Sequence, residues 1–292
     1  MTESRGRVGV LWAITAIFAI FNIVTAVMPT PLSPGAVGII NTLLLVAFAL
    51  LHGALQYGGK GIAIFLVVCL VVSNVFENCS ILTGFPFGHY YYTDVLGPKL
   101  FLVPVAIGGA YFGAGYLSWT VSQVLLGRTK GAIDTFARWT LPVVASFLMT
   151  SWDFTLDPSA STVDHYWIWQ NGGGFFGVPF QNYMGWLLTV FIFFAIFSGY
   201  VASRRAAGSP QVTRLAPAFW AQTIVMYALL GLRPVLAFLA STPAGQVVDA
   251  TGHVWLIRDI QETAALAAVF TILAFSAIAA LRLPDPRTDA RS

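Results

Sequence analysis

The chain has 292 residues, of which 57% are hydrophobic and 9% are charged, and its formal net charge is +3. Soluble domains carry about 25% charged residues, so this composition excludes an ordinary soluble protein and predicts a protein of the membrane. The small positive excess reflects basic residues between apolar runs and does not predict a nucleic-acid-binding surface.

Apolar runs long enough to cross a bilayer recur along the whole chain. About 20 helical residues cross a hydrocarbon core of roughly 30 Å. We therefore predict an all-α, polytopic membrane helix bundle that forms a single domain over residues 1–292. The eight expected transmembrane helices are 8–28, 36–56, 61–82, 100–126, 139–156, 183–203, 216–240 and 260–281. The fifth of these is short and contains Pro142, and the seventh carries Arg233.

The basic residues predict the orientation of these helices, because Lys and Arg concentrate in cytoplasmic loops. With a cytoplasmic amino terminus and eight crossings, twelve basic residues fall inside, only Lys99 and Arg258 fall outside, and Arg233 falls within a span. The first apolar run lacks a small-residue cleavage site, so no cleavable signal peptide is expected. We predict a multi-pass protein of the cytoplasmic membrane with both termini cytoplasmic.

Two loops on the predicted outer side, 83–99 and 157–182, are long and rich in Gly, Pro and aromatic residues. Their aromatic content argues against disorder, and long ordered loops in compact proteins are often functional. Both contain the pattern G-x-P-F-x-x-Y, as GFPFGHY at 84–90 and GVPFQNY at 177–183. The pattern predicts Gly-Pro turns and aromatic side chains over the same face of the membrane.

The third span ends in a polar stripe within an apolar helix. Glu77 follows Ser73 by four residues and Asn74 by three, so all three side chains lie on one side of the helix. A carboxylate in hydrocarbon is costly unless it is paired or protonated. Glu77 is therefore either one half of an ion pair, for which Arg233 is the candidate partner, or a chemically functional group. Both interpretations are open at this point.

A second stripe lies on the fifth span, where Ser146, Thr150, Asp153 and Asp157 follow a spacing of 4, 3 and 4 residues. Asp153 is either a functional carboxyl group or a solvated group at a helix end, and Asp157, which precedes Pro158, suits a helix terminus or turn.

The last two spans bring further polar residues to the same depth. Glu262 suits the first turn of a helix, where it complements the helix dipole, and Arg233 suits a charge partner. We take Glu77 and Asp153 as the candidate reacting pair. The surrounding candidates are Asn74, Asn78, Tyr90, Trp152, Asp157, Asn182, Tyr227, Arg233 and Glu262.

Several chemistries have little support in the sequence. The four histidines, His52, His89, His165 and His253, are scattered, whereas membrane di-iron enzymes need clustered ligands. No Gly-rich dinucleotide fingerprint is present. Asp153 and Asp157 could hold magnesium and a diphosphate, but a second acidic motif is missing. These observations favour an acid–base site that uses no metal and no cofactor, in an apolar and aromatic cavity.

Two segments carry a specific resemblance. ENCSILTGFPFGHYYYTDVLGPKL (77–100) and SWDFTLDPSASTVDHYWIWQNGGGFFGVPFQNYMGW (151–186) resemble the integral-membrane carotenoid hydratases, the group of gamma-carotene hydratases and bisanhydrobacterioruberin hydratase. The resemblance covers roughly residues 73–190. One departure is Ser80, where this family is expected to have glycine.

The resemblance implies that water adds to the terminal double bond of an acyclic carotenoid end and gives a tertiary alcohol. The implied substrate is a long polyene in the lipid bilayer, and other enzymes of carotenoid biosynthesis are the expected partners. A buried carboxyl group favours its protonated form and can act as an acid, while an ionised one can activate water. We assign Asp153 as the acid and Glu77 as the base, and the reverse assignment is open.

Three alternatives remain at this stage. The first is a prenyltransferase-like enzyme that uses magnesium and a diphosphate. The second is a lycopene-cyclase-like enzyme, which shares the protonation step. The third is a carotenoid-binding membrane protein without catalytic activity.

Overall fold

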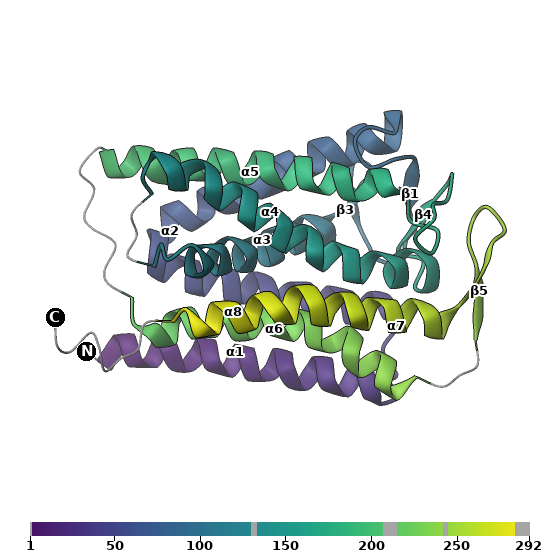
Figure 1. Ribbon diagram of the computed structural model, residues 1–292, viewed down its shortest axis with the longest axis horizontal. Helices are drawn as coiled ribbons and strands as arrows, with labels where there is room; N and C mark the ends of the chain where they lie inside the picture. Colours follow the sequence, from purple (N-terminus) through teal and green to yellow (C-terminus); the bar gives the residue numbers. More distant parts are fainter. Residues whose placement is uncertain (1, 130–132, 207–214, 242–244, 284–292) are drawn as a thin grey trace.

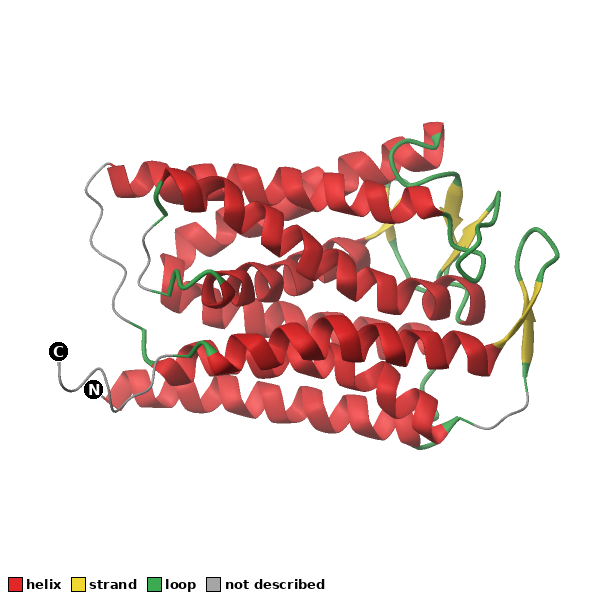
Figure 2. Cartoon of the chain, viewed as in Figure 1, coloured by secondary structure: helices red, strands yellow, loops and turns green. Residues whose placement is uncertain are grey.

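The computed structural model describes residues 2–129, 133–206, 215–241 and 245–283. Long helices run side by side along the long axis of the molecule, and short strands gather at one end (Figure 1, Figure 2). The helices are α1 (Thr2–Val27), α2 (Pro34–Thr83), α3 (Val105–Leu125), α4 (Thr135–Asp157), α5 (Phe180–Ala206), α6 (Pro217–Ala240), α7 (Ile257–Ala268) and α8 (Ala274–Leu281), with π-helical turns η1 (Pro158–Val163) and η2 (Val269–Leu273). The strands are β1 (Tyr90–Tyr92), β2 (Lys99–Leu100), β3 (Val103–Pro104), β4 (Trp167–Trp169), β5 (Gln246–Val248) and β6 (Val254–Leu256).

Each predicted span overlaps a helical segment, with two differences. The span 100–126 begins in the β2–β3 hairpin, because α3 starts at Val105. The spans 36–56 and 61–82 are the two arms of α2, and Gly58, at φ 72° and ψ 167°, breaks the helical path between them. Glycine adopts this positive φ without the steric cost that a side chain brings. The last span, 260–281, comprises α7, η2 and α8 in one continuous run.

Among the described residues, five helical segments are long and apolar enough to cross a membrane: Val8–Val27, Pro34–Thr83, Phe180–Arg204, Pro217–Ala240 and Ile257–Leu281. The chain is therefore a predominantly helical protein of membrane character. The predicted spans in α3 and α4 do not belong to this set. In α3, every residue from Tyr111 to Val124 is buried, so its polar side chains face other helices.

Pro142 does not end α4, although proline removes a helical hydrogen bond. The missing N–H would bond the carbonyl of Arg138, four residues earlier. Ser198 on α5 supplies the replacement, because its Oγ donates to the Arg138 carbonyl oxygen at 2.8 Å. This contact keeps α4 continuous and joins it to α5.

The two long loops meet in a short antiparallel ladder at the strand end of the bundle. In this β1–β4 ladder, Tyr90 is opposite Trp169 and Tyr92 is opposite Trp167. These four side chains are buried, whereas Tyr91 between them is exposed. Side chains alternate between the two faces of a strand, so the ladder directs two tyrosines and two tryptophans toward the helices.

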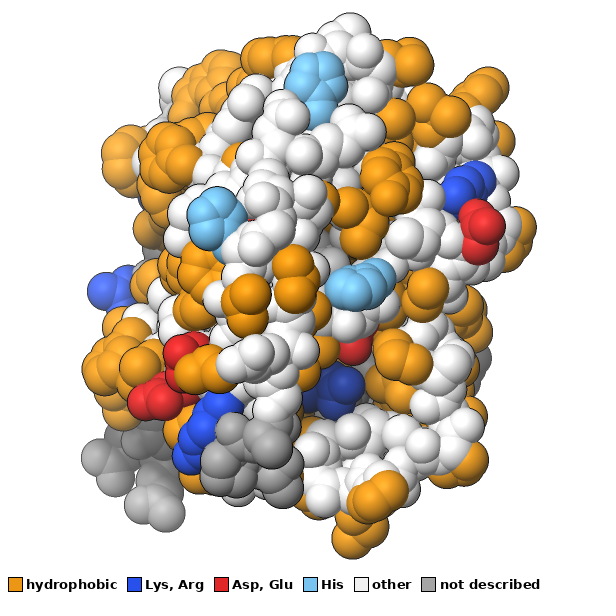
Figure 3. All heavy atoms as spheres, turned by 90° about the vertical axis from the view of Figure 1, so that its right-hand side faces the viewer, with side chains coloured by type: hydrophobic (Ala, Val, Ile, Leu, Met, Phe, Trp, Pro, Cys, Tyr) orange, Lys and Arg blue, Asp and Glu red, His pale blue; other side chains and the backbone are white. Residues whose placement is uncertain are grey.

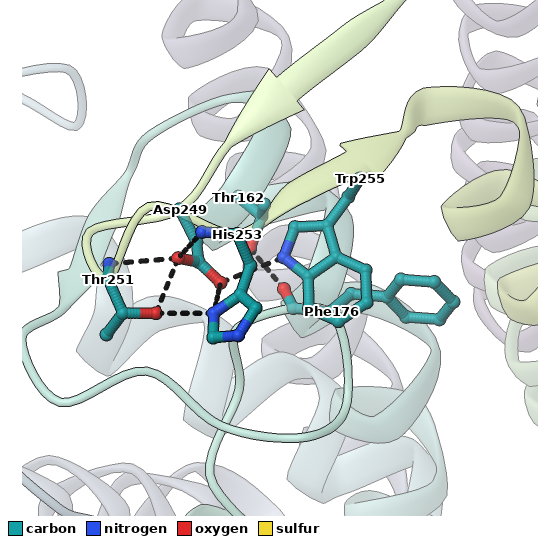
Figure 4. A network of polar contacts seen from close by, with 6 residues as sticks. All are labelled: Thr162, Phe176, Asp249, Thr251, His253 and Trp255. Atoms are coloured by element: carbon teal, nitrogen blue, oxygen red, sulfur yellow. Dashed lines mark hydrogen bonds and ion pairs between the residues drawn. The ribbon is translucent and has the colours of Figure 1, made fainter.

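A second hairpin, β5–β6, lies against the loop that follows α4. Asp249 organises its turn, because one carboxylate oxygen accepts from the backbone N–H groups of Thr251 and His253, and the other accepts from Trp255 Nε1 at 2.9 Å (Figure 4). The Trp255 ring packs edge-on against Phe176, with ring centroids 5.3 Å apart. The hairpin is thereby fixed to the segment that carries β4.

Candidate functional site

A cavity of about 590 Å³ lies at the strand end of the bundle. It is lined by residues of α1, α2, α3, α4, α5, α6 and α7, together with the four inward side chains of the β1–β4 ladder. Most of its wall is apolar, yet Glu77, Asp153 and Asp157 all line it. Each of these three carboxyl side chains is at most 3% exposed.

Glu77 is surrounded by tyrosine hydroxyl groups. Its Oε1 accepts from Tyr111 at 2.8 Å, and its Oε2 accepts from Tyr92 at 2.9 Å and also from Tyr90. The tyrosines come from α3 and β1, so the ladder must form before the set is complete. A carboxylate that accepts three hydroxyl donors has the hydrogen-bonding role of an ionised acid.

Asp153 and Asp157 are connected by one amide group. Asn182 Nδ2 donates to Asp153 Oδ2 at 3.1 Å and to Asp157 Oδ2 at 2.7 Å. Asp157 Oδ1 also accepts from Trp167 Nε1 at 2.9 Å and Trp169 Nε1 at 3.2 Å. Within the described residues, Asp153 accepts only the bond from Asn182, which leaves its Oδ1 free to face the cavity.

The two aspartates therefore have different surroundings. Asp157 accepts three N–H donors, and such donors stabilise the charged form of a carboxyl group. Asp153 has a single donor and an open oxygen, and burial disfavours the charged form of a carboxyl group that few donors stabilise. Asp153 is thus suited to carry a proton.

An aromatic wall lies beside these carboxyl groups. Tyr111 and Trp186 stack with ring centroids 4.5 Å apart and an interplanar angle of 4°, and Trp152 meets Trp186 edge-on at 6.2 Å. All three line the cavity. Aromatic faces attract cations, so this wall can stabilise positive charge that develops next to the carboxyl groups.

The structure brings Glu77, Tyr90, Trp152, Asp153, Asp157, Asn182 and Arg233 to one cavity. Arg233 is not the ion-pair partner of Glu77, because its Nη1 donates to Thr25 Oγ1 at 3.3 Å and the oxygens of Glu77 are bound by tyrosines. The ion-pair interpretation of Glu77 is therefore wrong.

Four of the sequence candidates lie outside the cavity wall. Asn78 Nδ2 donates to the Asn74 carbonyl oxygen at 2.7 Å, and Asn78 Oδ1 accepts from the Leu102 N–H at 3.1 Å, so this pair anchors a loop. Tyr227 donates to the Leu148 carbonyl oxygen at 2.8 Å within the core. Glu262 is exposed. These positions fit structural roles.

Ser80, the departure from the expected glycine, has a defined contact. Its Oγ accepts from the Phe87 N–H at 3.0 Å and donates to the Gly88 carbonyl oxygen at 2.9 Å. The hydroxyl group therefore pairs two buried backbone groups in the turn that leads into β1. Through this turn Ser80 supports the position of Tyr90.

Tyr111 is the main site residue that the sequence did not indicate. It lies in the segment GGAYFGAG, whose small residues predict close helix packing and give no indication of a polar site. A buried tyrosine hydroxyl normally needs a polar partner. That requirement was the available signal, although it does not identify Glu77 as the partner.

Comparison with known proteins identifies relatives of this chain. The chain is 27% identical over 190 residues to the bisanhydrobacterioruberin hydratase of Haloarcula japonica, and the match covers 65% of this chain and 62% of the relative. It thus spans less than two thirds of that protein. No solved structure matches the chain. Residues 35–249, more than half of the chain, match the family model of carotenoid biosynthesis proteins. The chain therefore belongs to the carotenoid biosynthesis protein family.

Proposed function

We propose that this protein is a carotenoid hydratase that adds water across the terminal double bond of an acyclic carotenoid end group. The observation that carries the proposal is the presence of two buried carboxyl groups with different surroundings, Glu77 and Asp153, on one aromatic-walled cavity. The name of the Haloarcula japonica relative supports the same reaction class.

The first step is protonation of the alkene. Asp153 gives its proton to the less substituted carbon of the terminal double bond, so a C–H bond forms and a tertiary carbocation remains. An unactivated alkene is a weak base and requires a well-placed acid. The single hydrogen bond to Asp153 leaves its second oxygen available for this role.

The second step is capture of the cation by water. Glu77, ionised and oriented by three tyrosine hydroxyl groups, takes a proton from the attacking water, so a C–O bond forms and the product is a tertiary alcohol. A proton then returns from Glu77 to Asp153 and completes the cycle. The reaction is redox-neutral, so the proposed chemistry requires no redox cofactor.

The aromatic wall has two functions in this proposal. The faces of Trp152, Trp186 and Tyr111 stabilise the carbocation between the two steps. Their apolar surface also accommodates the end of the polyene, whose remaining length lies among the helices or in lipid.

We further propose that the chain is one domain that crosses the cytoplasmic membrane eight times, with both termini cytoplasmic. The arrangement in Figure 1 supports this, since α1 begins and α8 ends at one end of the bundle, opposite the strands. The cavity then opens near the outer side. Neighbouring enzymes of carotenoid biosynthesis would deliver the polyene and remove the alcohol.

Expression in a carotenoid-producing host tests the proposed function. We expect the pigments to gain the mass of one water molecule for each hydrated end, as measured by mass spectrometry against the same host without the gene. An isomeric pigment of unchanged mass would instead indicate a cyclase. Unaltered pigment bound to the purified protein would indicate a carotenoid-binding protein.

A further inference from the structure

The cavity has a second polar wall that the two carboxyl steps do not use. It lies across α1, α2, α6, α7 and the segment after η1. A hydrocarbon chain gains nothing from polar groups, and a buried polar group without a partner costs about 1–3 kcal/mol. This wall therefore suits a polar occupant better than a hydrocarbon chain, even though Asn22, Asn41 and Thr25 already bond protein groups. Its members are Asn22, Thr25, Asn41, Asp164, Arg233 and Gln261.

Arg233 is the least satisfied member of this wall. A guanidinium group has five N–H donors, and within the described residues the single hydrogen bond from Arg233 goes to Thr25 Oγ1 at 3.3 Å. The charge of Asp164 acts on Arg233, yet no direct salt bridge joins the two in the described part of the chain. Oppositely charged groups held slightly apart are commonly bridged by water.

Two acceptors complete the surroundings that water needs. Gln261 Oε1 is buried and has no hydrogen-bond partner among the described groups. Pro234, next to Arg233, lacks the N–H that would bond the carbonyl of Leu230, and both residues line the cavity. A buried water typically makes two to four hydrogen bonds, and this wall offers donors and acceptors in that number.

We propose that Arg233, Asp164 and Gln261 form a water-entry site, which admits water from the strand end and holds it for the carbocation. The face at this end is hollowed below its centre, and a Lys or Arg side chain is visible in the hollow (Figure 3). The inference rests on the proposed hydration. Arg233 is a positioning residue in it, since it orders water and does not contact the reacting carbons.

Assays in heavy water separate water supply from alkene protonation. Asp153 then delivers a deuteron, which forms a C–D bond. The cation either takes up heavy water and becomes the alcohol, or returns a proton to Asp153 and becomes an alkene that retains deuterium. When water is poorly supplied, more of the cation returns to the deuterium-labelled alkene. Mass spectrometry of the recovered alkene therefore measures water supply separately from the yield of alcohol.

We expect Arg233→Met to lower alcohol formation about tenfold or more, which corresponds to the loss of one buried polar partner, and to raise deuterium in the recovered alkene. Arg233→Lys should restore part of the alcohol. Asp153→Asn should give neither alcohol nor labelled alkene. Arg138→Met, an exposed arginine outside the cavity wall, is the matched control and should resemble the wild type.

Three results would overturn the inference. Normal hydration by Arg233→Met would show that the wall does not supply water, and loss of alcohol without labelled alkene would show a structural effect. If Arg233→Met lost activity only on substrates whose end already bears oxygen, the wall would bind substrate oxygen and not water. If the wild type forms no alcohol, the proposed function itself fails, and the water-entry site fails with it.

Discussion

Asn182 and Asp153 are joined by a hydrogen bond of 3.1 Å between the amide Nδ2 and Asp153 Oδ2, which connects the first turn of α5 to the last turn of α4. The same nitrogen reaches Asp157 at 2.7 Å. One neutral side chain thus fixes two carboxyl groups and leaves their other oxygens for different tasks. Asp157 is bound by tryptophans, and Asp153 faces the cavity.

Replacement of Asn182 by leucine should disrupt both carboxyl groups while keeping a similar volume. We expect a loss of about 1–3 kcal/mol in the free energy of unfolding, because buried polar groups lose their donor, together with loss of hydration. Thermal unfolding in detergent and pigment analysis measure the two effects. Met184→Leu, at an exposed position of the same helix outside the cavity wall, is the control. A stable and fully active N182L protein would contradict this role.

Glu77→Gln and Asp153→Asn should each abolish hydration and leave the protein folded, because both preserve shape and remove the group that transfers protons. Pigment mass measures activity, and the yield of protein from the membrane measures folding. Asp259→Asn changes an exposed carboxyl group outside the cavity and should remain active. Full hydration by either cavity variant would eliminate the proposed acid–base pair.

Tyr111→Phe should keep the stacked ring on Trp186 and remove one donor to Glu77. A hydrogen bond to a charged group contributes about 1.5–3 kcal/mol, so we expect turnover to fall about tenfold or more. Tyr116→Phe is the matched control, because this hydroxyl bonds His52 Nδ1 at 2.6 Å, away from the cavity wall. If both variants hydrate equally well, the Tyr111 hydroxyl has no part in the reaction.

Asp164 should make stability depend on pH in mildly acidic solution. Burial raises the pKa of Asp164 from 3.8 to about 6, although the charge of Arg233 opposes this shift. A raised carboxyl pKa means that the folded state binds the proton more tightly. The resulting stabilisation is complete below the unfolded pKa and is lost as pH rises through about 6.

Thermal unfolding at a series of pH values tests this expectation. As pH rises from about 4 to above 6, the unfolding temperature of the wild type should fall relative to that of Asp164→Asn. Asp94→Asn, at an exposed position, provides the comparison. A difference that is constant over this range would show that Asp164 is not protonated on folding.

The helices follow from local sequence, because an apolar run specifies a membrane-length helix without reference to distant residues. The exception lies at Gly58. The sequence predicts both arms of α2 as separate spans, but it does not predict that they join directly at this residue. Polar stripes also placed Glu77 and Asp153 on defined helix faces. Within the site, therefore, the sequence indicated which carboxyl groups to consider.

The hydrogen bonds of those carboxyl groups come from residues on other helices and strands. The spacing of polar residues along one helix does not indicate these partners. Tyr111 lies 34 residues from Glu77, and Trp167, which donates to Asp157, lies on the strand β4 that pairs with β1. The alternative pairing of Glu77 with Arg233 failed for the same reason, since opposite charges at equal depth need not face each other. Glu262 shares that depth but lies on an exposed helix face.

The β1–β4 ladder also constrains how this site can change through insertions and deletions. Tyr90 and Tyr92 donate hydrogen bonds to Glu77, while Trp167 and Trp169 donate to Asp157. All four side chains depend on the single pairing register of the ladder. A slip of one residue would turn each side chain to the opposite face. Length changes should therefore be tolerated elsewhere in the two loops but not within these six paired positions, because one added residue would remove donors from both carboxyl groups at once.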